Sequence, residues 1–256
     1  MKGALQFILC ILSIPLCGQD FTISPRPYAL PGTPAFDTVT SPTRRAALCN
    51  VDSLELQQMS NNDLIVAALH YPFLKVANAF NSPQMGYKAA AKYRDDAKKN
   101  PINELTSVNK TSHFRQTGAD LLAYYKMMDI ESVLQDQNKP FNYSISPYHF
   151  IQVFLATPQV YGQLTESQQR ELLREAIRRY DAAKLAAHYS LVPGSAILLM
   201  ARILNANSFH EFIMYKNKRP IKVNPLLEDT GVFVDSTLYP VIRQMAVKWS
   251  GYVASN

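Results

Sequence analysis

Apolar residues recur three or four positions apart over most of the chain beyond residue 51, and this spacing predicts α-helices. The clearest helix begins after Thr165, where Thr-Glu-Ser-Gln has the form of a capping box. Leucine, alanine and tyrosine then fill one face, and arginine and glutamate fill the others. Other helices are predicted over residues 61–80, 84–98, 116–134, 147–157, 191–212 and 235–253, with a short apolar turn at 102–108.

Prolines interrupt two of the predicted helices, and few segments have the pattern of a strand. Pro72 falls inside the 61–80 segment, where it either kinks the helix or starts a second one, and Pro240 interrupts the last segment. The best strand candidate, Gly231–Val234, is very short. We therefore expect an all-α fold over residues 51–256, either an irregular multi-helix bundle or an α-solenoid-like array of antiparallel helices. The apolar segment 191–212 has few polar residues and is expected to be central.

The first 18 residues have the layout of a secretory signal peptide. Lys2 precedes an uninterrupted apolar run, Ala4–Leu16, and the small Gly18 is a suitable cleavage position that would leave Gln19 as the new N-terminus. A lipoprotein anchored at Cys17 is the alternative, although the bulky Leu16 disfavours it. No later segment reaches the roughly 18 consecutive apolar residues of a membrane span. The chain is therefore expected to be exported to the periplasm, the cell surface or the medium.

Residues 19–50 are rich in proline, which removes backbone donors and disfavours helices and central strands. This segment is predicted to be an extended linker. The alternative is a strap that lies on the surface of the domain through the aromatic residues Phe21, Tyr28 and Phe36.

Residues with catalytic or metal-binding chemistry do not form a known pattern. Cys49 is the one cysteine outside the leader and is expected to be a small packed residue. His210-Glu211 lacks the second histidine of a zinc peptidase motif. Ser195 lacks the glycine of a nucleophile elbow and is interpreted as a helix N-cap. No cofactor or metal is predicted, and the adjacent acids at 95–96 and 228–229 are interpreted as solvated surface.

The chain carries a formal net charge of +6, and one segment concentrates it. Between Phe212 and Leu227 there is no acid, and the segment is predicted to be a basic loop that meets an anionic polysaccharide, lipid headgroups or an acidic envelope protein. A solvated loop without a partner is the simpler alternative. Nucleic acid is not expected as a partner, since stacking motifs are missing around the basic residues. The candidate contact residues are Lys216, Lys218, Arg219 and Lys222.

Several phrases occur in an order that resembles a group of uncharacterised bacterial secreted helical proteins. They cover Met59–Pro72, Ala79–Tyr87, Ile102–Leu105, Gly118–Tyr125 and Leu199–Leu204. The resemblance implies a helical exported protein and brings no catalytic residues. The chain departs from the group's pattern at Arg115–Gly118, where an aspartate usually follows the arginine.

Two classes of function remain open from the sequence. A helical scaffold without a catalytic motif favours a non-catalytic binding or adaptor module of the cell envelope or the secreted proteins. The alternative is a secreted hydrolase whose site is assembled from residues distant in sequence, for example His149 with a carboxylate.

Overall fold

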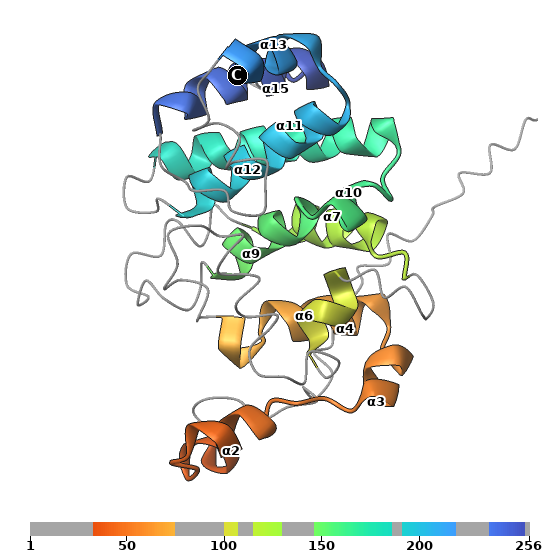
Figure 1. Ribbon diagram of the computed structural model, residues 1–256, viewed down its shortest axis with the longest axis vertical. Coiled ribbons are helices and arrows are strands. Elements are labelled where there is room, and N and C mark those ends of the chain that lie inside the picture. Colours follow the sequence, from red (N-terminus) through yellow and green to blue (C-terminus); the bar gives the residue numbers. More distant parts are fainter. Residues whose placement is uncertain are drawn as a thin grey trace, which may run out of the picture.

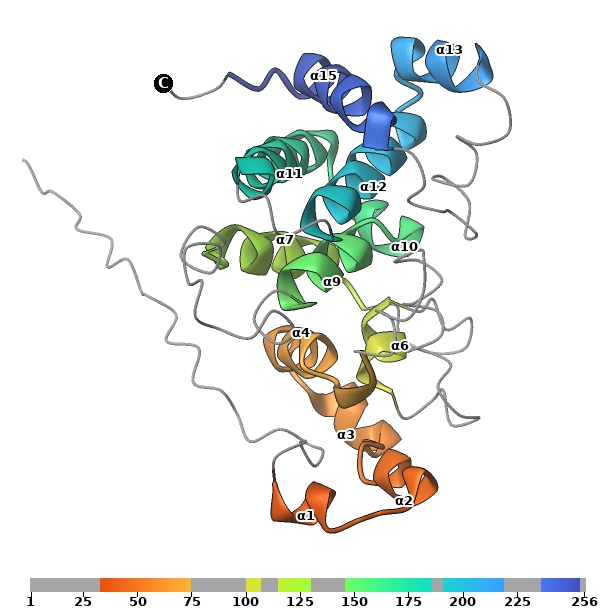
Figure 2. The same cartoon turned by 90° about the vertical axis from the view of Figure 1, so that its left-hand side faces the viewer.

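The computed structural model describes residues 33–74, 100–106, 115–129, 146–185, 191–218 and 236–253, and the elements there are all helical. Figures 1 and 2 show helices stacked along the long axis in chain order, from α1 at one end to α13 and α15 at the other. This arrangement confirms the all-α fold. The helices are α1 (Pro34–Asp37), α2 (Pro42–Ala47), α3 (Ser53–Gln58), α4 (Asn61–Leu69), α6 (Pro101–Thr106), α7 (Gly118–Met127), α9 (Ser146–Leu155), α10 (Pro158–Tyr161), α11 (Glu166–Leu185), α12 (Leu191–Ala206), α13 (His210–Lys218), the 3-10 helix η3 (Ser236–Leu238) and α15 (Tyr239–Ser250).

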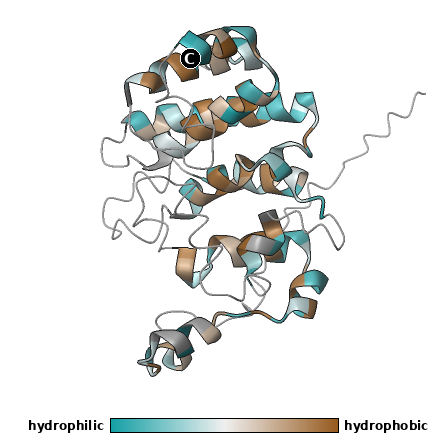
Figure 3. Ribbon diagram, in the orientation of Figure 1, coloured by the Kyte–Doolittle hydropathy of each residue, from teal (hydrophilic) through white to brown (hydrophobic). Residues whose placement is uncertain are grey.

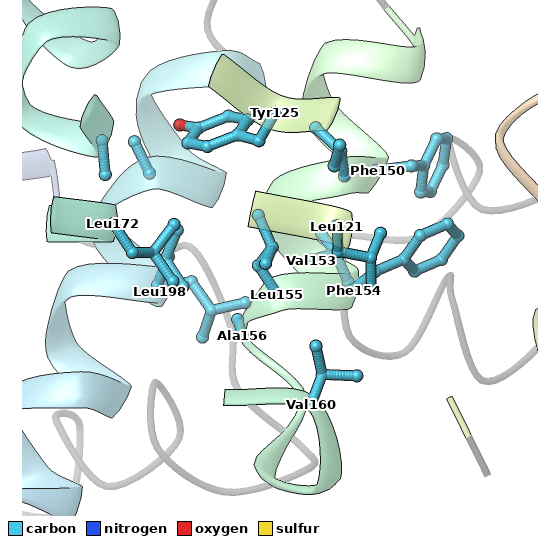
Figure 4. Close-up of a cluster of buried hydrophobic side chains, with 14 of the residues drawn as sticks. Leu121, Tyr125, Phe150, Val153, Phe154, Leu155, Ala156, Val160, Leu172 and Leu198 are labelled. Carbon is cyan, nitrogen blue, oxygen red and sulfur yellow. The ribbon is translucent and has the colours of Figure 1, made fainter. Parts of the chain in front are cut away.

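The hydrophobic core runs through the middle of this stack. Helix α12 packs against α9, α11 and α15, and α7 packs against α9. Figure 3 shows hydrophobic positions alternating with hydrophilic ones along these helices, as expected for elements with one buried face. Figure 4 shows how side chains from four helices meet in this core, namely Leu121, Tyr125, Phe150, Val153, Phe154, Leu172 and Leu198.

The capping box predicted before α11 is present. The backbone N–H of Gln168 donates to Oγ1 of Thr165 at 3.3 Å, and the backbone N–H of Thr165 donates to Oε1 of Gln168 at 2.9 Å. These reciprocal bonds satisfy two donors that would otherwise lack partners at the start of the helix. The longest described helix therefore begins where the local sequence predicted it.

The segment predicted as one central helix over 191–212 is two helices. Its first part, α12, is central as expected, and Ile197, Leu199 and Met200 are fully buried. The helix ends at Ala206, and Ser208 has φ +50°, in the left-handed region that stops a helix. A new helix, α13, then begins at His210. Ser195, interpreted as an N-cap, instead lies inside α12 and is buried.

Other predicted segments are shorter in the structure. Helix α4 ends at Leu69, before Pro72. The ring of a proline disfavours helical backbone at the residue that precedes it. The turn predicted at 102–108 overlaps the helix α6, which runs from Pro101 to Thr106. The segments 84–98 and 231–234 lie outside the described residues.

The N-terminal part differs from the extended linker that was predicted for residues 19–50. Both Pro34 and Pro42 stand at the first position of a short helix, where a missing N–H costs no hydrogen bond. Phe36 and Cys49 belong to the same core cluster as Trp249. From residue 33 onward the chain therefore contributes side chains to the core, whereas Phe21 and Tyr28, the other aromatic residues of the strap alternative, lie outside the described residues.

The last helix, α15, starts with Pro240 in its first turn and ends at Gly251, which has φ +66°. This left-handed backbone suits glycine and ends the helix. Ile242, Ala246 and Trp249 are on its buried face. None of the helices in the described ranges has the length and apolar character needed to cross a membrane.

Candidate functional site

Helix α13 carries two of the four basic residues that the sequence singled out. Lys216 and Lys218 lie in its last turn, whereas Arg219 and Lys222 lie outside the described residues. The sequence predicted a loop from Phe212 onward, and this is wrong up to residue 218. The helix continues because Phe212 is fully buried and Ile213 packs against the core, which gives this segment an apolar face.

The two lysines have different surroundings. Nζ of Lys216 donates to Oδ1 of Asn205, near the end of α12, at 2.8 Å. This bond fixes the lysine near the junction of α12 and α13. Lys218 is exposed and has no hydrogen-bond or ion-pair partner among the described residues. An exposed ammonium group at a helix C-terminus is stabilised there and stays available to an anion.

Helix α15, which packs against α13, carries two further cations that reach different helices. Lys248 forms an ion pair with Glu211 of α13. The guanidinium group of Arg243 forms two hydrogen bonds with Asp181 of α11, at 2.6 and 2.5 Å. We name the set Lys216, Lys218 and Lys248 the α13–α15 basic surface, since Arg243 is directed toward α11.

Many of the arginines elsewhere are engaged inside the molecule. Their guanidinium groups donate to carbonyl oxygens at the C-terminal ends of helices, where the last carbonyls lack helical partners. Arg115 donates to Gln57 and Met59 at the end of α3, at 2.7 Å in each case. The other arginine–carbonyl pairs are Arg202 with Ala156 after α9 at 2.8 Å, Arg174 with Ser250 of α15 at 2.9 Å, and Arg170 with Trp249 of α15.

Arg179 is the most deeply buried of these arginines. Its guanidinium group lies over the ring of Tyr125 at 4.0 Å from the centroid and donates to the carbonyl oxygens of Tyr125 and Met128. Its Nε donates to Oε1 of Glu175 at 2.6 Å. Arg178 also donates to this carboxylate, at 2.8 and 3.0 Å. The cluster links α7 to α11 and has the character of a structural support.

The titration of this cluster follows from its geometry. Burial acts to raise the pKa of Glu175, but hydrogen bonds and charge from Arg178 and Arg179 outweigh it, and the pKa of the carboxyl is lowered. Burial raises the pKa of Tyr125 far above its ordinary range. Glu175 is therefore ionised and Tyr125 is neutral near neutral pH.

Residues considered for catalysis are spread over separate elements. His149, named for the hydrolase alternative, is buried in α9 with its ring against Phe150 at 4.8 Å between centroids. His70 follows the last residue of α4, and His210 is the first residue of α13. His113 and His188 lie outside the described residues. Within the described part of the chain, no three His, Cys, Asp or Glu side chains are grouped so that they could hold a metal ion.

The basic surface is thus the candidate binding site, and the sequence predicted part of it. Sequence reasoning found Lys216 and Lys218 but missed Lys248 and Arg243. The latter two lie on α15, more than twenty residues beyond α13, and the packing of α15 brings Lys248 to Glu211 of α13 and Arg243 to Asp181 of α11. The arginine–carbonyl pairs were also missed, because the paired residues are 46 to 79 positions apart in sequence. Comparisons with protein-family models, curated proteins and solved structures gave no match.

Proposed function

We propose that the protein is an exported, non-catalytic binding module of the cell envelope that contacts an anionic partner through the α13–α15 basic surface. The partner is an acidic envelope protein or an anionic polysaccharide. The observation that carries the proposal is the charge at this end of the stack, where Lys216 and Lys218 have no acidic partner among the described residues and Lys248 has only the exposed Glu211. Clustered charge of one sign attracts an oppositely charged partner and speeds its association.

The distribution of the remaining charge supports the choice of this surface. Arginines such as Arg115, Arg179 and Arg202 donate hydrogen bonds to backbone carbonyls of the protein itself. Their guanidinium groups are therefore engaged within the molecule. Lys126 on α7 is paired with Glu171. Lys216 and Lys218 have no acidic partner among the described residues, which leaves their charge for an external anion.

The support beneath the surface also suits a binding role. Phe212 anchors α13 in the core, and Ile242 and Ala246 anchor α15. Both helices are therefore held by buried side chains, and their lysines project from a fixed backbone. A rigid scaffold lowers the entropy that binding must overcome.

The proposal is tested by capture from envelope extract. The full chain, expressed with its own N-terminal segment and a removable C-terminal tag, is compared with a variant in which Lys216, Lys218, Arg219 and Lys222 are changed to Ser. We expect a discrete protein or polysaccharide to be retained by the parent chain, lost by the variant, and released as salt is raised, since salt screens contacts between exposed charges.

A matched control removes lysines elsewhere. Lys126→Ser and Lys184→Ser change exposed or partly exposed cations of α7 and α11 and should leave capture intact. Equal retention by the four-residue variant and the parent chain would show that Lys216, Lys218, Arg219 and Lys222 do not carry the binding. Absence of any partner from both samples would count against the binding module itself.

Export is tested separately, on the processed chain. We expect the protein recovered outside the cytoplasm to begin at Gln19, as the small Gly18 before it predicts. A mature chain that begins at a lipid-modified Cys17 would instead establish the lipoprotein alternative.

A further inference from the structure

Resting on the proposed function, we infer that the partner is an anionic polysaccharide and that Glu211 is an internal competitor for it. In the free protein the carboxylate of Glu211 is paired with the ammonium group of Lys248. On binding, an anionic group of the polysaccharide takes the place of this carboxylate. The ion pair between Glu211 and Lys248 is the contact that carries this inference.

The position of Glu211 on the helix places it in line with the exposed lysine. Glu211, Met214 and Lys218 are spaced three and four residues apart, so they share one face of α13, and all three are exposed. Lys248 reaches this face from α15. At a rise of 1.5 Å per residue, Glu211 and Lys218 lie about 10 Å apart along the helix axis. A polymer with repeated anionic groups can therefore contact both ends of the face at once.

The ion pair can be exchanged at little cost because both partners face solvent. The side chain of Lys248 is 64% exposed and that of Glu211 is 45% exposed. Exposed pairs of this kind contribute little to stability, since water screens them and ordering the side chains costs entropy. An incoming carboxylate or sulfate replaces one solvated ion pair with another, while Glu211 returns to water.

The surface suits a polysaccharide better than a protein. Protein partners usually bury a central apolar patch ringed by polar residues. The large exposed hydrophobic side chains of the described residues are Leu54, Met127, Met214 and Val253, and each lies on a different segment of the chain. Around Met214 the described exposed neighbours on α13 are charged or polar. Recognition there rests on charge, which a polyanion supplies along its whole length.

The test measures binding of the full chain to polygalacturonate, a carboxylate polysaccharide, at about 0.1 M salt. Glu211→Gln should tighten binding by roughly two- to fivefold, because Lys248 no longer has a competing carboxylate. Glu55→Gln is the matched control, since it makes the same change in net charge on α3 at the other end of the stack (Figure 1). It should leave affinity unchanged, because that distance exceeds the screening length of about 10 Å.

Two further variants separate the inference from the proposed function. The double variant Glu211→Gln/Lys248→Gln should lose the gain, since the gain requires the freed lysine. Lys218→Ser should weaken binding whether or not Glu211 competes. Equal affinities for Glu211→Gln and Glu55→Gln, with Lys218→Ser still weaker, would overturn the competitor role and leave the basic surface in place.

The polysaccharide assignment has its own comparison. Poly-L-glutamate of matched charge density should bind more weakly than polygalacturonate, and uncharged dextran should not bind. Tighter binding of poly-L-glutamate would overturn the assignment in favour of an acidic protein. If none of the probes binds and Lys218→Ser has no effect, the basic surface is not a polyanion site and the proposed function falls with the inference.

Discussion

Nη2 of Arg179 donates a hydrogen bond to the carbonyl oxygen of Met128 at 2.8 Å. The side chain of Arg179 is fully buried on α11, and Met128 is the C-cap residue of α7. The carbonyl at this position has no partner within its own helix. The guanidinium group supplies that partner and also places positive charge at the negative end of the helix dipole. One side chain thereby fixes where α7 ends and how α7 and α11 sit together.

Replacement of Arg179 should therefore be strongly destabilising. Arg179→Ala leaves two carbonyl oxygens and the carboxylate of Glu175 without this donor, and we expect a loss of about 3 kcal/mol in the free energy of unfolding. Arg178→Ala is the control, because the side chain of Arg178 is 38% exposed, and its loss should cost about 1 kcal/mol or less. Urea unfolding followed by circular dichroism measures both. Similar losses for the two variants would contradict a special role for the buried arginine.

The lowered pKa of Glu175 predicts that acid weakens the fold. A carboxyl group whose pKa is lower in the folded state stabilises the protein above its unfolded pKa, near 4.5, and this contribution disappears as the pH falls through the folded value. Glu175→Gln should thus cost about 2 kcal/mol of unfolding free energy near pH 7, and the difference from the parent chain should shrink below about pH 4.

Glu171→Gln is the matched control for this pH series. Glu171 is also on α11, but its side chain is 44% exposed and it pairs with the exposed Lys126. The change should cost about 0.5 kcal/mol or less across the series. A difference between Glu175→Gln and the parent chain that stays constant from neutral to acidic pH would show that the charge of Glu175 does not contribute.

The sequence predicted those features whose cause lies within a few residues. The capping box of Thr165 and Gln168 spans three positions, and the start of α11 was predicted correctly from it. The apolar run after Ser195 was recognised as central because its composition alone requires burial. Pro72 was recognised as an interruption, and α4 ends before it.

Features that depend on contacts between distant residues were not predicted. The break at Ser208 separates α12 from α13, and no glycine or proline marks it in the sequence. The short helices at Pro34 and Pro42 were missed because the prolines of this segment were interpreted as helix breakers, whereas proline is well suited to the first position of a helix. Lys248 was missed as part of the α13–α15 basic surface because it reaches Glu211 of α13 only through the packing of α15.

A close approach between α7 and the end of α10 predicts that Gly118 does not tolerate a side chain. A Cβ atom added at Gly118 would lie 2.8 Å from the carbonyl oxygen of Val160 and 3.1 Å from Cβ of Gln163. The same contact brings Oε1 of Gln163 to the N–H groups of Thr117 and Gly118, at 2.8 and 2.7 Å, where it caps α7 in place of its own N-cap side chain.

Gly118→Ala should push these elements apart and weaken the cap, with a cost of about 2 kcal/mol in the free energy of unfolding. Ala119→Ser, at an exposed position on the next residue, should change stability by about 0.5 kcal/mol or less. Thermal or urea unfolding of the two variants compares them directly. A Gly118→Ala protein as stable as the parent chain would mean that α7 can shift without losing the bond to Gln163.

Cys49 provides a probe of whether the N-terminal helices stay docked on the core. Its side chain is fully buried, and burial raises the pKa of the thiol to about 11. Only the thiolate reacts with a disulfide reagent, so at about pH 8 the folded protein should react slowly and at a rate set by opening of the structure. The reaction should become fast in urea, once the segment around Cys49 is released. Cys49→Ser measures any signal from Cys10 and Cys17. Labelling of Cys49 in the native protein as fast as in urea would show that residues 33–50 leave the core readily, and the docked arrangement of α1 and α2 would then be a minor state.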